Sequence, residues 1–438
     1  MKTVIMAGGK GTRIASVASD IPKPMIRIGG KPVLEHQIEN LKACGLTDIT
    51  LVVGHLGSVI KDYFGDGSRF GVHISYFIES HPLGTAGALF KMPELQDDFL
   101  LMCGDVMLSV DFCRFIRFHR GHQAWASLMA HPNGHPYDSS LLVTETLPPA
   151  EKGGLPIDTH RVTGWLNKED ERRYYQNRVN AGIEILSPHL LDDVRSHFVP
   201  RHPEQPDKID LDRDVLKASL ATGKIFAYDT PEYIKDMGTP DRFHDVELDL
   251  LSGKVDARNL QHPQKAVFLD RDGTINLHTG FICRTDDLEL IPGAAEAVRL
   301  INRSGYLAVV VSNQPVIARG ECTFQELRNI HDKMETLLGQ GGAYVDAIYY
   351  CPHHPDKGFE GERPEYKKEC LCRKPQPGLL LQAAKDWNID LTQSYMIGDS
   401  DKDVTAGQNA KVRQSLLIPS NTPGSLLCAV QQLLTPNS

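Results

Sequence analysis

The apolar run Ala266–Leu269 ends directly in two carboxylates, Asp270 and Asp272. Such a run is typical of a buried strand, and open parallel sheets form their ligand crevice at the carboxyl ends of the strands. Strand alternation would send both carboxylates to one side, but a turn at Gly273 lets their roles differ. We therefore expect one carboxylate to attack phosphorus and the other to handle the leaving-group proton. The alternative is an acidic turn without a catalytic role.

Further strands and helices are predicted because short apolar segments alternate with amphipathic ones along most of the chain. After this run we expect helices at Gly293–Asn302 and Thr323–Leu338, and strands at Leu307–Val311, Ala347–Tyr350 and Ser394–Ile397. Before it we expect a helix at Val33–Cys44 and strands at Thr3–Ala7, Ile49–Val53, Ile74–Ile78 and Phe99–Cys103. The pattern predicts an α/β chain whose N-terminal half forms a doubly wound parallel sheet. Two stretches rich in Pro, Gly and charge, His131–Leu155 and Pro200–Asp214, are predicted as long loops.

A glycine loop, Gly8-Gly-Lys-Gly-Thr-Arg13, follows the first predicted strand. In this position several backbone N–H groups can face phosphate oxygens, and Lys10 and Arg13 add charged contacts. Lys23 stands between two prolines a little further on. The glycine loop alone is weak support, since such loops also form ordinary tight turns.

Four soft or borderline metal ligands occur in two close pairs, Cys351-Pro-His353 and Cys370-Leu-Cys372. Two pairs separated by a polar loop suit a tetrahedral, fully protein-coordinated Zn²⁺ site of the structural kind. His354 and His331 are alternative fourth ligands. Buried free thiols with surface histidines are the non-metal alternative.

Charge and composition exclude several classes of function. The net charge of −9 and the absence of a basic block argue against nucleic-acid binding. No apolar run approaches the roughly eighteen residues of a membrane span, and the N-terminus lacks signal-peptide architecture. The nine cysteines do not form a disulfide framework, so we expect a cytoplasmic protein.

The length of 438 residues indicates roughly two or three domains. Hydrophobic periodicity is lost between Leu248 and Gln264, which contain Ser252-Gly253 and His262-Pro263. We therefore place one domain at residues 1–248, a linker at 249–264 and a second domain at 265–438.

The N-terminal half resembles the sugar-1-phosphate nucleotidylyltransferases. Ala7–Arg13 with Lys23-Pro24 is similar to their signature, and further blocks follow in the family's order: Pro82–Ala88, Cys103–Asp105, Val179–Glu184 and Lys235–Pro240. The resemblance implies a Rossmann-like nucleotidyltransferase domain that binds a nucleoside triphosphate, a sugar phosphate and Mg²⁺. The physics agrees, because joining two phosphates requires charge neutralisation and carboxylates suit a hard cation.

The resemblance also implies residue roles. Asp105 and Asp236 would hold Mg²⁺, Arg13 would stabilise the departing pyrophosphate, and Lys23 would contact the α-phosphate. The implied substrate contacts are Gly8, Gly9, Gly11, Thr12, Leu83, Gly84, Thr85, Gly87, Asn180, Gly182 and Glu184. The family's Glu-Lys-Pro lysine is missing, and Lys168 is the nearest candidate for it. Without the resemblance, Asp105 would be interpreted as a helix N-cap and Asp236 as a turn residue.

The C-terminal half resembles the haloacid dehalogenase (HAD) phosphatases over residues 265 to about 425. Asp270-x-Asp272, Ser312, Lys374 and Asp399 match the four family motifs in order. Together with the Cys/His pairs and Arg373, they resemble the branch of heptose-bisphosphate 7-phosphatases and histidinol-phosphatases. One departure is Pro315 after Gln314, where related proteins have Ser-Gly.

This second resemblance implies a HAD-like Rossmannoid fold with a zinc loop, and a second set of roles. Asp270 would be the nucleophile and Asp272 the general acid/base. Ser312, Asn313 and Lys374 would hold the phosphoryl group, and Arg373 would contact substrate. Asp270, Asp399 and the backbone of Asp272 would bind Mg²⁺, supported by Asp403, while Zn²⁺ would occupy the site of Cys351, His353, Cys370 and Cys372.

The two resemblances describe consecutive steps, because a 7-phosphatase acting on heptose 1,7-bisphosphate yields the sugar 1-phosphate that a nucleotidylyltransferase consumes. We expect a bifunctional enzyme that makes GDP-D-glycero-α-D-manno-heptose from heptose phosphates and GTP, as needed for lipopolysaccharide or capsule. The choice of GTP follows from the resemblance of Pro82–Ala88 to the mannose- and heptose-1-phosphate guanylyltransferases. The oligomeric state stays open, and a homo-oligomer is compatible with the sequence.

Two rival interpretations remain. In one, the transferase takes another sugar 1-phosphate, of the mannose or glucose type, and the phosphatase takes another ester such as histidinol phosphate. In the other, one domain is a silent scaffold. The second rival predicts missing metal carboxylates, whereas all five are present: Asp105, Asp236, Asp270, Asp272 and Asp399.

Overall fold

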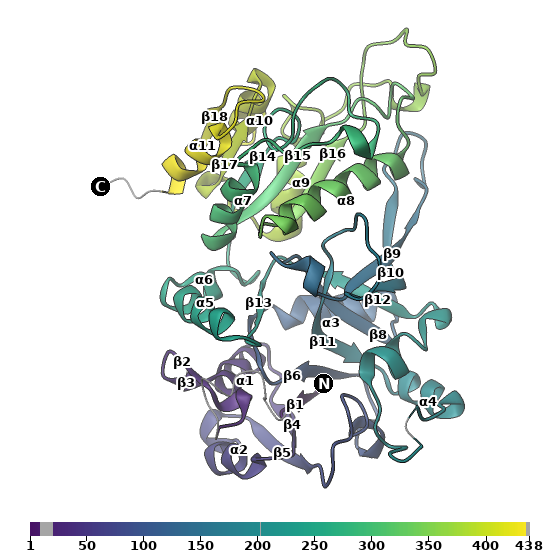
Figure 1. The fold of residues 1–438 in the computed structure, drawn as a ribbon, viewed down its shortest axis with the longest axis vertical. Helices are drawn as coiled ribbons and strands as arrows, with labels where there is room; N and C mark the ends of the chain where they lie inside the picture. The colour runs from purple at the N-terminus through teal and green to yellow at the C-terminus, as the bar shows by residue number, and fades with distance from the viewer. Residues whose placement is uncertain (9–20, 202, 435–438) are drawn as a thin grey trace.

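Two β-sheets organise the chain, one in each half (Figure 1). The computed structural model describes residues 1–8, 21–201 and 203–434. The predicted contacts of Gly9, Lys10, Gly11, Thr12 and Arg13 therefore lie outside the described residues. Residues 1–248 are called the N-terminal part below, and residues 265–438 the C-terminal part.

Within the described residues, the first sheet has nine strands in the order β5-β4-β1-β6-β11-β8-β12-β10-β9. Their bounds are β1 (Lys2–Met6), β4 (Asp48–Val53), β5 (His73–Ile78), β6 (Phe99–Cys103), β8 (Ala126–His131), β9 (Leu141–Leu147), β10 (Ile157–Leu166), β11 (Val179–Leu186) and β12 (Ile225–Asp229). The four strands predicted in this part are confirmed to within one residue, because each is a short apolar run; β1, β4 and β6 become largely buried, whereas β5 stays partly exposed at the edge of the sheet.

The predicted parallel arrangement holds for the four predicted strands β5, β4, β1 and β6, and β12 also runs parallel to β8. Strand β11 runs antiparallel to β6 and β8, and β9 and β10 form an antiparallel hairpin. The prediction of a loop over 131–155 is therefore wrong in its middle, which is β9. Leu141 and Leu142 are buried there, while the prolines and glycines that suggested a loop lie on either side of the strand.

The helices of this part are α1 (Val33–Ala43), α2 (Gly57–Phe64), α3 (Phe112–His122), α4 (Pro188–His197), α5 (Pro240–Leu251) and α6 (Lys254–Ala257). Helix α3 begins where the Asp111 side chain accepts hydrogen bonds from two backbone N–H groups of the first turn. Short strand pairs are formed by β2 (Arg27–Ile28) with β3 (Lys31–Pro32), and by β7 (Val106–Ser109) with β13 (Tyr233–Asp236).

The described C-terminal part contains a parallel sheet in the order β16-β15-β14-β17-β18. Its strands are β14 (Lys265–Leu269), β15 (Tyr306–Asn313), β16 (Ala347–Cys351), β17 (Tyr395–Gly398) and β18 (Gln414–Leu417). Its helices are α7 (Ala294–Arg303), α8 (Phe324–Gln340), α9 (Gly378–Trp387), α10 (Asp401–Asn409) and α11 (Ser425–Leu434). One face of the sheet is covered by α7, α8 and α11, and the other by α9 and α10, so both faces carry a buried core.

Single helical turns complete the described elements: η2 (Lys23–Met25), η3 (Ser68–Phe70), η4 (Leu89–Lys91), η5 (Pro136–Asp138), η6 (Leu211–Leu216), η7 (Leu220–Thr222), η8 (Thr285–Asp287), η9 (Pro364–Tyr366) and η10 (Leu391–Gln393). Across residues 1–8, 21–201 and 203–434, no helix combines the length and apolar character that crossing a membrane requires.

The segment 249–264 contains the last three residues of α5 and the whole of α6. It also touches both parts, because Arg258 donates to the Pro231 carbonyl and pairs with Asp346, and Asn259 donates to the Ser109 hydroxyl at 3.2 Å. The division at 1–248 and 265–438 remains our proposal.

Candidate active sites

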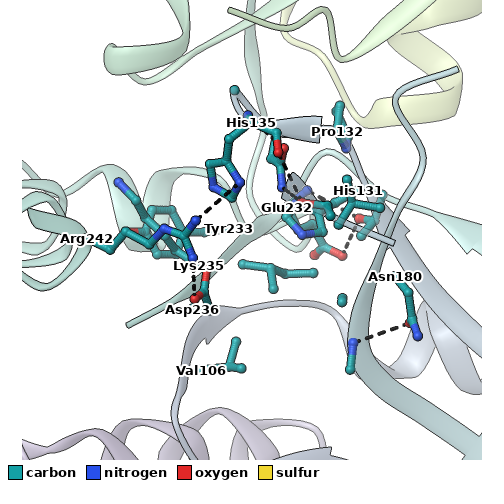
Figure 2. A pocket seen from close by; sticks show the side chains of 18 of the residues that line it. Val106, His131, Pro132, His135, Asn180, Glu232, Tyr233, Lys235, Asp236 and Arg242 are labelled. Carbon is teal, nitrogen blue, oxygen red and sulfur yellow. Dashed lines mark hydrogen bonds and ion pairs between the residues drawn. The ribbon is translucent and has the colours of Figure 1, made fainter. Parts of the chain in front are cut away.

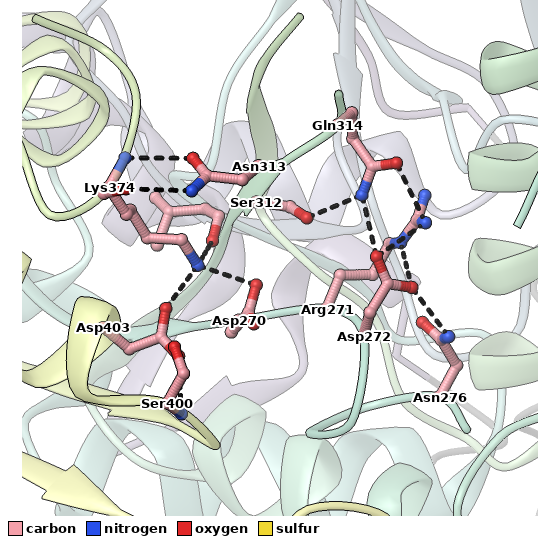
Figure 3. A network of polar contacts seen from close by, with 11 residues as sticks. Asp270, Arg271, Asp272, Asn276, Ser312, Asn313, Gln314, Lys374, Ser400 and Asp403 are labelled. Carbon is pink, nitrogen blue, oxygen red and sulfur yellow. Dashed lines mark hydrogen bonds and ion pairs between the residues drawn. The ribbon is translucent and has the colours of Figure 1, made fainter. Parts of the chain in front are cut away.

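A buried lysine lies between two carboxylates at the carboxyl end of β14 (Figure 3). The Nζ of Lys374 is 2.7 Å from Asp270 Oδ1 and 2.6 Å from Asp403 Oδ1, and it donates to the Val311 carbonyl at 2.7 Å. Lys374 is 2% exposed and Asp270 9%, so this charge cluster is largely dry. A cation held this way can neutralise a phosphoryl group that approaches the Asp270 carboxylate.

The pKa of Asp270 is raised to about 7, chiefly by burial and also by the Asp403 and Asp272 carboxylates, which together outweigh the lowering by Lys374. Burial also opposes the charge on Lys374, but Asp270 and Asp403 outweigh it and raise its pKa. The lysine therefore stays charged beside the carboxylate that is proposed to attack phosphorus.

Asp272 points to a different set of partners, although it is only two residues away. Its oxygens accept from Arg271 at 2.9 and 3.0 Å, from Asn276 at 2.9 Å and from Gln314 at 2.9 Å. Burial opposes its ionisation, but the Arg271 guanidinium and these hydrogen bonds outweigh burial and lower the pKa of Asp272. The two carboxylates thus have separate environments, and the lowered pKa means that Asp272 must gain a proton when substrate binds before it can act as the predicted general acid.

Carboxylate oxygens of Asp270, Asp399 and Asp403 lie within 4.8 Å of one another. Gly273 makes this approach possible, since its φ is +83° and a Cβ there would stand 2.0 Å from Asp399 Oδ2. Three oxygen ligands of this kind fit Mg²⁺, which prefers carboxylates and keeps water or substrate oxygens in its other positions. The Asp272 carboxylate lies outside this group, which leaves only its backbone for the predicted metal contact.

The other predicted residues of this site lie close by. Ser312 Oγ accepts from Gln314 at 2.8 Å, and the Asn313 amide exchanges two hydrogen bonds with the Lys374 backbone at 2.9 and 3.0 Å. Arg373 donates to the His353 carbonyl at 3.0 Å, so its guanidinium is held against the Cys/His loop.

The four predicted zinc ligands come together. Five pairs of their ligand atoms are 3.2 to 3.7 Å apart, and the atoms involved are Cys351 Sγ, Cys370 Sγ, Cys372 Sγ and His353 Nδ1. Bonds of about 2.3 Å to a tetrahedral zinc would put sulfurs roughly 3.7 Å apart, so a zinc ion fits with small adjustment. Hydrogen bonding with Cys351 lowers the pKa of Cys372 to about 4, which supplies a thiolate. Neither His354 nor His331 joins this group.

A cavity of about 640 Å³ opens beside the first sheet. It is lined by Asn180, Gly182, Glu184 and Asp236, four residues that the sequence placed at a sugar-phosphate site. Figure 2 shows Asn180 and Asp236 on two sides of this cavity. Such a volume is within the range of small-molecule sites.

The two predicted metal carboxylates of this site come from the last residue of β13 and from the turn between β6 and β7. β13 pairs antiparallel with β7 so that Asp236 stands opposite Val106, next to Asp105. Lys23 Nζ lies 3.3 Å from Asp105 Oδ2. Arg242, which the sequence analysis did not identify, holds both oxygens of Asp236 at 2.7 and 2.9 Å and contacts His135 Nδ1 at 3.5 Å. A metal on Asp236 would therefore share this carboxylate with Arg242.

Asn180, Gly182 and Glu184 lie along an irregular stretch of β11. Asn180 Oδ1 accepts from the Gly182 N–H at 3.3 Å, and the φ of +68° at Gly182 favours glycine. Glu184 is 1% exposed. Burial, reinforced by the Asp212 carboxylate, raises the pKa of Glu184 well above its usual range, which favours the protonated form that can donate to a hydroxyl oxygen.

The two glycines of Leu83–Gly87 lie so close to neighbouring backbone that a larger residue would not fit. A Cβ on Gly84 would stand 2.4 Å from the Ile209 carbonyl oxygen, and one on Gly87 would stand 2.2 Å from that of Asp207. Thr85 Oγ1 accepts from the Leu211 N–H at 2.7 Å. Of the predicted nucleotide contacts in 83–87, only Thr85 lines the cavity.

Lys168 does not line this cavity. Its Nζ is 3.5 Å from Asp138 Oδ1, beside a shallower hollow that His135 and Arg242 also line. Its proposed phosphate contact remains a prediction.

Several polar residues at these sites escaped sequence reasoning: Arg271, Asn276, Gln314, Asp212, Arg242 and His135. Arg271 offered a signal, because it stands between two motif carboxylates and is completely buried. The others were assigned no role from the sequence, and only their packing shows what they contact.

The nucleotidyl transferase family matches residues 2–253, more than half of the chain, and a HAD-hydrolase-like family matches residues 371–422. Over 161 residues the chain is 42% identical to the D-glycero-beta-D-manno-heptose-1,7-bisphosphate 7-phosphatase of Pasteurella multocida, covering 36% of this chain and 84% of that protein.

Two solved structures were also compared. HddC from Yersinia pseudotuberculosis complexed with GMP-PN is 25% identical and covers 57% of this chain and 99% of its own, with a TM-score of 0.46. D,D-heptose 1.7-bisphosphate phosphatase from B. bronchiseptica, complexed with magnesium and phosphate, is 32% identical and covers 39% of this chain and 98% of its own, with a TM-score of 0.34.

The protein is an enzyme of two kinds in one chain, a nucleotidyltransferase and a HAD phosphatase. The N-terminal part brings it into the nucleotidyl transferase family, and the C-terminal part belongs with the D-glycero-beta-D-manno-heptose-1,7-bisphosphate 7-phosphatases. The resemblances stated from the sequence are thereby confirmed at the level of family.

Proposed function

We propose that the C-terminal part removes the 7-phosphate of D-glycero-D-manno-heptose 1,7-bisphosphate, and that the N-terminal part transfers GMP from GTP to the resulting heptose 1-phosphate. The observation that carries the proposal is the buried Asp270–Lys374 pair at 2.7 Å, in a chain whose other half places Asp236 opposite Val106, the residue that follows Asp105. The product of one reaction is the acceptor of the other.

In the phosphatase reaction, an Asp270 oxygen attacks the 7-phosphorus, and the bond from phosphorus to the sugar oxygen breaks. Asp272 supplies the proton that the leaving oxygen needs. It then takes a proton from the water that attacks the aspartyl-phosphate, which releases phosphate. Lys374 neutralises the approaching anion. Mg²⁺ bound by Asp270 and Asp399 would add positive charge where the phosphoryl group transfers.

In the transferase reaction, an oxygen of the sugar 1-phosphate attacks the α-phosphorus of the nucleotide, and pyrophosphate leaves. Lys23 and Arg242 lie beside Asp105 and Asp236, where these anions would meet. Mg²⁺ on the two carboxylates would reduce the repulsion between them. Glu184 and Asn180 would hold sugar hydroxyl groups.

The nucleobase and the anomer are the finer parts of the proposal. GTP is favoured by the resemblance of Pro82–Ala88 to guanylyltransferases. The name of the phosphatase relative specifies the β-anomer, whereas our product is the α-anomer, so the two anomers must be tested separately.

A coupled assay on the intact chain tests the proposal. Each anomer of the 1,7-bisphosphate is supplied with each nucleoside triphosphate and Mg²⁺, and phosphate, pyrophosphate and nucleotide-sugar are followed. We expect GDP-heptose from the α-anomer with GTP. Phosphate release without nucleotide-sugar would refute the transferase half. Faster hydrolysis of histidinol phosphate, or faster transfer to mannose 1-phosphate, would refute the choice of substrate.

A further inference from the structure

One wall of the transferase cavity comes from the C-terminal part. The end of α7 and the turn before β16 contribute Arg299, Asn302, Arg303, Gly342, Tyr344 and Asp346 to its lining. The two parts touch at this wall, since a Cβ on Gly134 would stand 2.8 Å from the Gly342 carbonyl oxygen. The residue after Gly134 is His135, which contacts Arg242 on Asp236 (Figure 2). The wall therefore lies close to the predicted metal carboxylate.

Among the residues that the structure describes, some of the positively charged side chains that line the cavity have carboxylate partners, and others do not. Of the six lysine and arginine side chains that line it, four have carboxylate partners: Arg242 with Asp236, Lys235 with Asp245, Lys254 with Asp249, and Arg258 with Asp346. The other two, Arg299 and Arg303, have no ion pair or hydrogen bond within the described residues. Both come from α7 of the C-terminal part.

Arg299 carries a further sign of an absent partner. Its Nε is buried and has no hydrogen-bond acceptor among the described residues. A buried donor without an acceptor costs free energy, and a charged one costs more than a neutral one. An anionic ligand oxygen in the cavity would remove this cost and would pair with the guanidinium in the geometry that phosphate favours.

The position of the arginines indicates the sugar rather than the nucleotide. The predicted sugar contacts Asn180, Gly182 and Glu184 all line the cavity, whereas Thr85 alone represents the predicted nucleotide contacts of 83–87. The 1-phosphate of the acceptor would be neutralised beside Asp236, Asp105 and Lys23, of which only Asp236 lines the cavity. The two unpaired arginines of the wall that α7 contributes suit a second anionic group on the same sugar.

We propose that Arg299 and Arg303 form an anion subsite of the transferase cavity that takes a distal phosphate, so that the cavity binds the sugar bisphosphate as well as the monophosphate. The inference rests on the proposed function, since it assumes a phosphorylated sugar as acceptor. The bisphosphate then competes with its own dephosphorylated product at the transferase site. Transfer speeds up once the phosphatase site has consumed the bisphosphate.

The test uses the full chain with Asp270→Asn, in which hydrolysis of the bisphosphate is blocked. GDP-heptose formation from heptose 1-phosphate and GTP is measured with increasing heptose 1,7-bisphosphate. We expect competitive inhibition against heptose 1-phosphate, with an inhibition constant that rises about tenfold or more when Arg299→Ala and Arg303→Ala are added. Arg284→Ala is the matched control, because Arg284 is an exposed arginine paired with Asp287, outside the cavity.

An inhibition constant unchanged by the double substitution would overturn the inference. A rise in the KM for GTP instead would also overturn it, because the arginines would then meet nucleotide phosphates. If no heptose 1-phosphate accepts GMP, the proposed function fails, and calorimetry with the bisphosphate decides the inference separately. Two binding sites in Asp270→Asn and one in the triple variant would support it, whereas equal stoichiometry would refute it.

Discussion

His353 of the C-terminal part and Gly153 of the N-terminal part meet at the Cys/His cluster, where the His353 Nε2 lies 3.1 Å from the Gly153 carbonyl oxygen. A carbonyl can only accept, so Nε2 carries the proton and Nδ1 is left free to bind a metal. Gly153 lies in the tip of the β9–β10 hairpin, which reaches toward the C-terminal part in Figure 1. Tyr366 and Lys368 also donate to this tip, at 3.0 and 3.2 Å.

Gly153→Val should weaken the proposed zinc site. A Cβ there would stand 2.3 Å from the Glu365 carbonyl oxygen, and the φ of +76° disfavours valine, so the hairpin tip must move away from His353. Loss of an outer-sphere partner typically costs a metal site about 10–100-fold in affinity. We expect zinc transfer to a chromogenic chelator to be faster by about tenfold.

Gly358→Val is the matched control for this experiment. Gly358 also has a positive φ, +97°, but open space where its Cβ would lie. If both variants release zinc at the same rate, backbone strain rather than the Gly153 carbonyl accounts for the effect, and the hairpin is not part of the zinc site.

Single substitutions at the two sites should separate the two activities. Asp270→Asn removes the proposed nucleophile and should lower phosphatase kcat by on the order of 10³-fold or more while nucleotidyl transfer continues. Asp105→Ala should do the reverse, with a loss on the order of 10²-fold or more in transfer. Both rates are measured on the same preparations, with folding checked by circular dichroism. Loss of both activities in either folded variant would contradict two independent sites.

Gly273→Ala should disable the phosphatase site without touching any charge. Its Cβ would stand 2.0 Å from Asp399 Oδ2 and 2.6 Å from Ser420 Oγ, so the carboxylate must leave the group formed with Asp270 and Asp403. A displacement of about 1 Å can cost on the order of 10²-fold in rate, and we expect a loss in kcat/KM of that size. Gly280→Ala, at φ +118° with open space around it, should keep near-normal activity. Equal losses in the two variants would mean that backbone strain, not the Asp399 contact, is decisive.

Stability should fall as pH rises, and part of this fall should come from Glu335. Burial, helped by Asp332, raises the pKa of Glu335 to about 8, while the Asn177 backbone, Arg178 and Arg328 act in the opposite direction. Between its unfolded pKa near 4.5 and about 8, the folded protein holds the extra proton, so the free energy of unfolding decreases with increasing pH. Above pH 8 this contribution is lost.

Glu335→Gln should flatten this dependence, because glutamine stays neutral in both states. Urea unfolding at pH 5.5 and 8.5 should show a difference smaller than in the parent by on the order of a few kcal/mol. Glu296→Gln, on the exposed side of α7, serves as the control. Parallel pH profiles for parent and Glu335→Gln would exclude Glu335 as the source.

Most strands and helices of the described residues could be predicted because each is specified by its own segment. Phe99–Cys103 was placed with its observed bounds, and the helix predicted at Val33–Cys44 is one residue shorter in the structure. Strand β9 escaped because Leu141–Leu147 lies among prolines and glycines, and because its partner β10 completes its hydrogen bonding. The direction of β11 was not predicted either, because its antiparallel pairing is made with β6 and β8 and is not marked within β11 itself.

The sequence by itself determined the two chemistries, because motif order and ligand type are local: Asp270-x-Asp272, the two Cys/His pairs and the glycine loop are each recognisable within a few residues. Only the tertiary structure decided which groups those residues meet. Asp212 beside Glu184, Gly153 at His353 and the two arginines in the cavity wall all join segments distant in the chain. Such contacts depend on how two buried cores pack together, and a local pattern of residues carries no record of that packing.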